Sequence, residues 1–377
     1  MGPIVLDVVS GWEAVELIFK CVFVGLWQMI KLSVRRLWKG HRRKISKNCP
    51  PVELTVDSSI GIHCYIKIMG VKYHYVETGP KYGKIVLILG DAPDTGGLWV
   101  PNWSSLVRRL AELGHHIITL DLRGTGASEP GDRKELSPSR AVAELKFLLT
   151  TLGVTDTNPA IVIGFGIGGM LTWYLVHCEG SLVSKFAVIS APHPNLYWQH
   201  PNTMLIFQWP YFPEKWLAEG AMQEDGRWAS SRARDWSGAL NYVRGAAWCR
   251  IHPEHTVQAR GLLVGDRDSA AQLVASAQYC SHPALRLLSN PNPGDKDLPG
   301  LLLDFLVGKF WRVSEKVLVY SMLAITYRVK RYGRTEVASF LIILLLSKKV
   351  IVIKTYFVKI LFLSFKNTIF TSYRYIG

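Results

Sequence analysis

The sequence predicts an α/β fold in which helices cover both faces of a mostly parallel β-sheet. Short apolar runs rich in β-branched residues alternate with segments that carry apolar residues every three or four positions, and this alternation is typical of such a sheet. The chain has 377 residues, 49% of them hydrophobic and 19% charged, so it is long enough to bury a large core. These values exclude a disordered or collagen-like chain.

The positions of the apolar runs give the individual elements. Eight runs are predicted as strands, at 62–68, 71–77, 85–89, 116–120, 160–163, 186–189, 261–264 and 285–288. Three segments between them are predicted as helices, at 103–113, 138–152 and 169–177. The core therefore comprises residues 51–192 and 251–312, and residues 1–50 and 313–377 flank it.

Residues 193–250 interrupt this alternation. They contain six of the thirteen tryptophans and several prolines, with no strand signal. We interpret them as a short helical insertion that caps the sheet, and inserts rich in aromatic residues commonly cover an apolar pocket. The alternative is that these rings only pack the insertion onto the core.

The net charge of +15 is concentrated at the two ends of the chain. Residues 1–50 carry nine basic and three acidic residues, residues 51–306 carry 22 and 24, and residues 307–377 carry 13 and two. Because phosphate binding needs a local surplus of lysine and arginine, the near-neutral middle argues against a nucleic-acid partner. The six cysteines lie far apart, without C-x-x-C pairs or nearby histidines, so we expect reduced thiols, no metal site and no cofactor.

Residues 1–50 are predicted to attach the protein to a membrane. The apolar segment 14–34 has about the length needed to cross a bilayer, although four charged or amide side chains interrupt it. Eight cationic residues follow within 31–47. If the segment spans a bilayer, they keep the rest of the protein in the cytosol, and if it lies flat they contact anionic headgroups. A third possibility is an amphipathic helix docked on the protein's own core.

Residues 313–377 form a basic and apolar tail that differs from the rest of the chain. Residues 337–377 contain no acidic residue, no proline and no tryptophan. The apolar run 337–346 is too short to cross a bilayer alone. The tail is interpreted either as a second membrane segment or as a translated extension that the functional protein lacks. The latter would make the chain a decaying or mispredicted gene product.

A glycine-rich turn within residues 160–170 is the strongest candidate for chemistry. Its sequence, AIVIGFGIGGM, predicts a buried strand, a tight turn and the start of a helix. Gly164, Gly166 and Gly169 satisfy the G-x-G-x-x-G pattern, which leaves a dinucleotide-binding oxidoreductase as an alternative. That fold places the turn after its first strand, with an acidic residue about 20 positions later. Here at least four predicted strands precede the turn, and residues 185–192 contain no acidic side chain.

The same geometry is that of a nucleophile elbow, which projects one side chain over the sheet near backbone N–H groups that stabilise an oxyanion. Further motifs occur in a fixed order: IGIHCY at 60–65, LDLRGTGAS at 120–128, GGMLTW at 168–173, APHPN at 191–195 and LVGDRD at 263–268. Together they resemble the epoxide hydrolase family of α/β-hydrolases, in particular its membrane-anchored animal members. The resemblance covers residues 58–312 and implies an α/β-hydrolase fold.

The resemblance also implies a two-step hydrolysis. An aspartate at the elbow attacks the epoxide to form an ester, a histidine supported by an acid activates water to cleave it, and two cap tyrosines hold the epoxide oxygen. This chain has Gly166 at the elbow position. The base is expected after the last strand, near Pro293, but the last histidine of the chain is His282, before that strand. Of the three catalytic groups only the supporting acid, Asp268, matches.

Other positions of the family's pattern differ as well. The cap tyrosines are expected at Val243, with Tyr242 one position early, and near Thr203. The oxyanion-hole positions correspond to Ala92 and Ile167. Ala92 lies in a GDAP sequence where the family has His-Gly-Phe-Pro.

These differences predict an epoxide-hydrolase-like membrane protein that is catalytically inactive and binds at most a lipophilic small molecule or an unidentified protein. Its expected location is the endoplasmic reticulum, with the hydrolase-like domain on the cytosolic side. The alternative is an active hydrolase of lipophilic epoxides or esters in which Asp91, Asp94 or Asp268 accepts a proton from water. His193 and Asp121 are interpreted as structural residues of turns.

Overall fold

The computed structural model describes residues 5–39, 61–91, 101–196, 207–209, 213–214, 236–252, 255–289, 291 and 297–308. The tail at 313–377 lies outside these residues, and so do Ala92, Asp94, Thr203 and Pro293. All eight predicted strands and all three predicted helices lie within the described residues and are observed.

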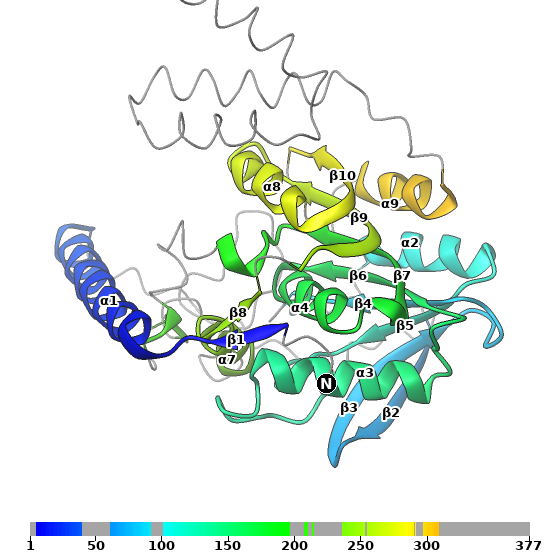
Figure 1. The fold of residues 1–377 in the computed structure, drawn as a ribbon, viewed down its shortest axis with the longest axis horizontal. Coiled ribbons are helices and arrows are strands. Elements are labelled where there is room, and N and C mark those ends of the chain that lie inside the picture. The colour runs from blue at the N-terminus through cyan, green and yellow to red at the C-terminus, as the bar shows by residue number, and fades with distance from the viewer. Residues whose placement is uncertain are drawn as a thin grey trace, which may run out of the picture. The chain divides into compact units, whose positions relative to one another are not determined.

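The predicted strands form one sheet. They are β2 (Ile62–Ile68), β3 (Val71–Thr78), β4 (Ile85–Leu89), β5 (His116–Leu120), β6 (Ala160–Phe165), β7 (Val183–Ile189), β9 (Val257–Gly265) and β10 (Cys280–Leu287). Their order in the sheet is β10-β9-β7-β6-β4-β5-β3-β2 (Figure 1). Every pairing from β10 to β5 is parallel, whereas β3 runs antiparallel to β5, and β2 antiparallel to β3. The prediction of a mostly parallel sheet is confirmed.

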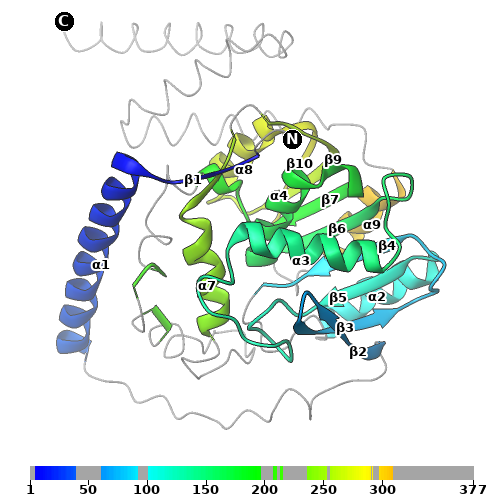
Figure 2. The ribbon, with the colours of Figure 1, turned by 60° about the horizontal axis from the view of Figure 1, so that its bottom comes forward.

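Helices cover both faces of this sheet, because its central strands are apolar at every position. They are α2 (Pro101–Glu112), α3 (Pro138–Thr151), α4 (Gly166–Cys178), α8 (Ala270–Ser276) and α9 (Asp297–Val307). Alternate side chains of β4 show the division: Leu87 and Leu89 pack with α3 and α4, whereas Val86 and Ile88 pack with α2 and α9. Figures 1 and 2 show these helix pairs on opposite faces.

The N-terminal segment packs on the end of the insertion. Strand β1 (Leu6–Val8) pairs antiparallel with β8 (Cys249–Ile251), and helix α1 (Gly11–Lys39) follows β1. Strand β8 begins at the end of the insertion that the sequence predicts as helical and finishes one residue beyond it, so that prediction is wrong at this end. The reason is that the partner strand lies near the start of the chain, where a three-residue strand leaves no local pattern.

The inner face of α1 contacts the protein itself. Leu17 and Cys21 are buried and pack with Trp248. The Cys21 carbonyl accepts a hydrogen bond of 2.9 Å from Nε1 of Trp209 in the insertion, and Gly25 lies directly against the same indole ring. On this face α1 is the docked amphipathic helix that the sequence offers as one possibility.

The outer face of α1 is apolar and exposed. Trp12, Phe19, Phe23 and Leu37 each expose more than 60% of their surface. Seven further apolar residues expose between 45% and 56%: Val15, Ile18, Val22, Leu26, Trp27, Ile30 and Val34. Within the described ranges, no helix combines the length and the apolar character required to cross a membrane.

Arg244 holds the described parts of the insertion together. It lies on α7 (Ser237–Ala246), and its guanidinium donates to the carbonyls of Phe207 at 2.7 Å and Trp209 at 2.6 Å. It also forms a buried ion pair of 2.7 Å with Glu214. Because Trp209 contacts α1, this arginine connects α7 to the N-terminal helix.

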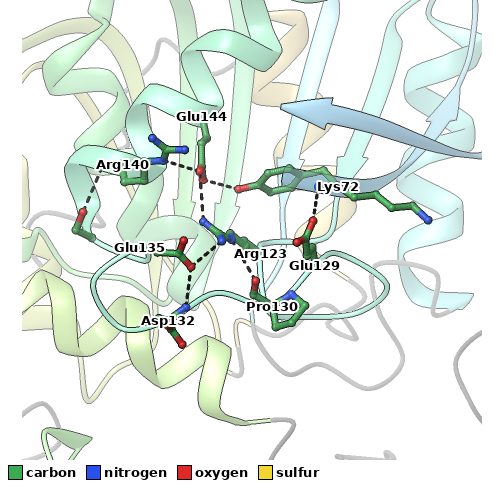
Figure 3. Close-up of polar contacts among 10 residues, drawn as sticks. Lys72, Arg123, Glu129, Pro130, Asp132, Glu135, Arg140 and Glu144 are labelled. Atoms are coloured by element: carbon green, nitrogen blue, oxygen red, sulfur yellow. Dashed lines mark hydrogen bonds and ion pairs between the residues drawn. The ribbon is translucent and has the colours of Figure 1, made fainter. Parts of the chain in front are cut away.

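A second buried network centres on Glu144 of α3 (Figure 3). Its Oε2 accepts a hydrogen bond of 2.5 Å from the Tyr73 hydroxyl, and its Oε1 accepts one of 2.9 Å from Arg140 Nε. Arg123 Nη1 lies 3.6 Å from the same Oε1, while Arg123 Nη2 donates to Glu135 at 2.8 Å. The network therefore ties the LDLRGTGAS loop to α3 and β3.

We expect Arg123→Met to lower the free energy of unfolding by about 3 kcal/mol, because it leaves the buried Glu144 carboxylate without a buried cation. Arg140 contacts the same carboxylate but exposes 38% of its side chain, so water can replace its donor. Arg140→Met should therefore lower the same free energy by about 1 kcal/mol or less. Urea unfolding followed by tryptophan fluorescence measures both values, and equal losses would contradict this division of roles.

Candidate active site

The predicted elbow is the turn between β6 and α4. Gly166, the first residue of α4, has a φ of +47°, in the left-handed region that residues with a side chain disfavour. The Gly168 N–H donates to the Gly90 carbonyl at 3.2 Å, and a Cβ atom on Gly168 would overlap the backbone of Leu89 and Gly90. The turn is therefore packed tightly against the end of β4.

The end of β4 brings Asp91 opposite Gly166. Strands β4 and β6 are parallel neighbours with Leu89 in register with Gly164, so the residues two positions further along each strand meet at the same edge of the sheet. A Cβ atom built on Gly166 would overlap all three atoms of the Asp91 carboxylate group. The Ile167 N–H donates to Asp91 Oδ1 at 3.0 Å. The Asp91 carboxylate thus occupies the space of the missing elbow side chain.

The sequence alone offers Asp91 only as one of three possible proton acceptors, and its position at the elbow is not predicted. The signal is a pair of differences from the family pattern: the elbow has no side chain, and a carboxylate stands at residue 91 where the family has glycine. Linking the two requires knowing that β4 and β6 are neighbours. The partial positive charge at the N-terminus of α4 favours an anion at this place.

The position of Asp91 also bears on the dinucleotide alternative. In that alternative the N–H groups at the start of the helix would bind a pyrophosphate. Here the Ile167 N–H already donates to a carboxylate. Because a phosphate and the Asp91 carboxylate repel each other, the geometry gives this alternative no support.

Asp268 lies in the turn between β9 and α8, and its side chain is exposed. The more enclosed carboxylate of this turn is that of Asp266, whose Oδ1 accepts a hydrogen bond of 2.7 Å from the Ser269 N–H. Burial acts to raise the pKa of Asp266, but hydrogen bonds from the side chain and backbone of Ser269 and from the Asp268 N–H outweigh it and lower this pKa. Asp266 is therefore held as an anion in the turn that leads to Ser269, the N-cap of α8.

The described histidines do not supply the base expected after β10. His282 lies on β10 itself and is exposed. Three others form a chain in which His193 Nε2 lies 3.1 Å from His177 Nε2, and His177 Nδ1 lies 3.2 Å from His255 Nδ1. His177 and His193 are buried, and His255 is half-buried. The His193 ring stacks on Tyr279 with centroids 3.6 Å apart. These contacts fit the structural role expected for His193.

The other turn residue singled out from the sequence, Asp121, is held in a similar way. Its Oδ2 accepts hydrogen bonds from the Ala127 N–H at 3.0 Å and from the His74 ring at 2.8 Å. His74 Nε2 in turn lies 3.0 Å from His63 Nδ1. Asp121 therefore joins the LDLRGTGAS loop to β3 and β2.

Two of the predicted cap residues, Tyr242 and Val243, lie in the interior, and Thr203 lies outside the described residues. Tyr242 is 2% exposed and lines a small cavity of about 10 Å³ beside Tyr73 and Glu144, beneath the LDLRGTGAS loop. Val243 is buried as well. This differs from the expectation that Tyr242 faces a cap pocket. The physical reason is that Tyr242 and Ala246, one helical turn apart, both pack into the core and set the buried face of α7.

The chain has the α/β-hydrolase fold, as predicted. A family profile described as alpha/beta hydrolase fold matches residues 89–241. The crystal structure of an epoxide hydrolase from Vigna radiata aligns with 67% of this chain and 100% of its own length, with a TM-score of 0.52 and 15% sequence identity.

Within that class the chain is similar to epoxide hydrolases. Human epoxide hydrolase 4 is 31% identical over 211 residues, which are 51% of this chain and 56% of that protein. Epoxide hydrolase 3 of Xenopus tropicalis is 28% identical over 183 residues, which are 45% of this chain and 47% of that protein. The chain thus spans about half the length of these relatives, and the predicted family resemblance is confirmed.

Lower pH should weaken the fold through its buried histidines. Burial lowers the pKa of His177 to about 3, with a further contribution from His255, and burial holds the pKa of His193 well below its ordinary value. In the unfolded chain these groups bind protons near pH 6.5. Above about pH 6.5 both histidines are neutral in the folded and the unfolded chain, and the full stability is present. As the pH falls from there toward 3, the unfolded chain binds protons that the folded chain does not, and stability is lost.

The free energy of unfolding should accordingly fall between pH 7 and pH 5.5, by up to about 1.4 kcal/mol per pH unit for each buried histidine. Carboxylates remain largely ionised in this range. His177→Gln should reduce the slope, and His282→Gln, at an exposed position, should leave it unchanged. Urea titrations at four pH values provide the slopes, and identical slopes in all three proteins would contradict the assignment.

The contact between Asp91 and Gly166 can be measured by a double-mutant cycle. Gly166→Ala should destabilise the fold by about 2 kcal/mol, because left-handed strain adds to the displacement of the Asp91 carboxylate from its hydrogen bond with the Ile167 N–H. In an Asp91→Ala background, the destabilisation caused by Gly166→Ala should fall to the value measured for Gly114→Ala. Gly114 also has a positive φ, but a Cβ atom there meets nothing within 4 Å. Additive losses in urea unfolding would show that Asp91 does not occupy the elbow.

Proposed function

We propose that this protein is an epoxide-hydrolase-like protein that binds a lipophilic epoxide or a related small molecule, does not hydrolyse it repeatedly, and lies on a membrane surface. The observation that carries the proposal is at the elbow, where Gly166 offers no side chain and a carboxylate from another loop fills its space. The names of the relatives, epoxide hydrolases 3 and 4, support the proposed class of ligand.

The absence of repeated hydrolysis follows from the need for a base. Cleaving an ester intermediate requires a group that takes a proton from the attacking water. The sequence contains no histidine after His282, which lies on β10, so the loop that follows this strand offers no imidazole. Asp268 is exposed, and the loop after β10 holds no imidazole for it to support.

The direct test is incubation of the full-length protein with the epoxide of oleic acid in ¹⁸O-labelled water. We expect no labelled diol above the amount formed by the matched variant Asp268→Asn, because no base completes the reaction. Mass spectrometry of the extracted lipid measures the diol. An active hydrolase would be supported instead if the protein formed many molecules of diol per protein molecule and the Asp268→Asn variant formed none.

The membrane part of the proposal rests on the two faces of α1. Its inner face is fixed to the protein through Leu17, Cys21 and Trp209, while its outer face leaves a row of large apolar side chains exposed. The sequence adds a cluster of cations from Lys31 to Lys47. An apolar face beside a basic segment suits a helix that lies flat on an anionic bilayer. The endoplasmic reticulum, with the hydrolase-like domain on the cytosolic side, stays the predicted location.

Binding to vesicles tests this arrangement. The full-length protein should sediment with phosphatidylcholine vesicles that contain phosphatidylserine, and binding should weaken at high salt. Phe23→Glu should lower the partition coefficient at least tenfold, since burying a phenylalanine contributes about 1.5–3 kcal/mol. Tyr82→Glu, at a residue 93% exposed in the turn after β3, is the matched control. Equal losses in both variants would contradict a membrane role for α1.

A further inference from the structure

We propose that Asp91 is the alkyl acceptor of this site, a carboxylate that β4 supplies in place of the nucleophile missing from the elbow, and that one lipophilic epoxide reacts with it to form a persistent ester. The inference rests on the proposed function, because the ester persists only if no base cleaves it. Nothing in the family pattern assigns chemistry to residue 91, which stands at the glycine position of the pattern's His-Gly-Phe-Pro sequence.

The first argument is position. In an elbow the reacting group projects from the residue at the start of the helix, over the carboxyl edge of the sheet. Gly166 holds that place with its positive φ, and the Asp91 carboxylate overlaps the point from which a side chain would project. The register of β4 with β6 fixes this placement from the neighbouring strand. The carboxylate is therefore present at the reacting position, although it is attached to a different residue.

The second argument is the hydrogen bond to Ile167. The backbone N–H of the residue after the elbow is one of the donors that stabilise an oxyanion in this fold. It donates to Asp91 Oδ1, the oxygen that becomes the carbonyl oxygen of an ester formed through Oδ2. This donor therefore positions the carboxylate for attack, and as the ester forms the negative charge leaves the carboxylate and develops on the ring oxygen of the epoxide. Asp91 is exposed, so a small molecule can approach it.

The proposed step balances without a cofactor. A lone pair on Asp91 Oδ2 attacks one ring carbon of the epoxide and forms a carbon–oxygen bond. The bond between that carbon and the ring oxygen breaks, and the electron pair moves to the ring oxygen, which takes a proton from water. The product is a β-hydroxyalkyl ester of Asp91, and hydroxide is released. Positioning one carboxylate beside the epoxide supplies the entropic advantage of an intramolecular reaction.

The test uses the full-length protein and the epoxide of oleic acid. Intact mass should increase by one adduct per molecule, and peptide fragmentation should place that adduct on Asp91. Alkaline hydroxylamine, applied to the denatured protein, should remove it and leave a hydroxamate, which distinguishes an ester from a thioether on cysteine. Asp91→Asn should lose the adduct and Asp268→Asn should keep it. Far-ultraviolet circular dichroism and the urea midpoint show whether each variant is folded, and Asp91→Glu provides a second carboxylate variant.

The outcomes separate the two proposals. One hydroxylamine-sensitive adduct on Asp91, with no diol, supports the inference. No adduct and no diol overturns it and leaves the proposed function standing, and an adduct on another residue has the same meaning. Diol formed in many turnovers overturns the proposed function and, with it, the persistent ester.

Discussion

The register between β4 and β6 is the constraint on which the candidate site depends. Leu89 pairs with Gly164, so the segments that follow β4 and β6 leave the sheet side by side, and Asp91 lies against the turn at Gly166. The hydrogen bond from the Ile167 N–H then fixes the carboxylate at the start of α4. Because both strands are buried between layers of helices, neither can shift by a residue without moving its apolar side chains to the wrong face. The core of the sheet thus determines the chemistry at its edge.

A similar dependence joins the N-terminal helix to the insertion. Arg244 binds the carbonyls of Phe207 and Trp209 from inside, and the Trp209 indole donates to the Cys21 carbonyl of α1. Strand β1 adds backbone hydrogen bonds to β8 just before the chain returns to the sheet. The helix proposed to lie on a membrane is therefore attached to the insertion.

Much of the fold could be predicted from the sequence, because the pattern that marks each strand lies within the strand itself. Each of the eight strands is a short apolar run, and each run can be recognised without its neighbours. Strands β1 and β8 could not be predicted, since each is three residues long and pairs with a partner at the far end of the domain. The buried position of Tyr242 was missed for a related reason: a family pattern gives its place in the sequence but not the face of α7 on which it lies.

The candidate site shows the same limit. The glycine at 166 and the missing histidine after β10 can be read directly from the residues. The position of the Asp91 carboxylate at Gly166 cannot be predicted in this way. Residues 91 and 166 are brought together only because β4 and β6 are neighbours in the sheet, although β5 lies between them in the sequence. Asp91 follows β4 and Gly166 follows β6, two strands later in the sequence, so the two residues become neighbours only after the sheet has formed.

The most direct measurement is a crystal structure of the full-length protein that resolves the side chains at the β6–α4 turn. We predict density for the Asp91 carboxylate over Gly166, with one of its oxygens within hydrogen-bond distance of the Ile167 nitrogen. A structure in which Asp91 points away from this turn, or in which another side chain fills the space above Gly166, would contradict the central claim.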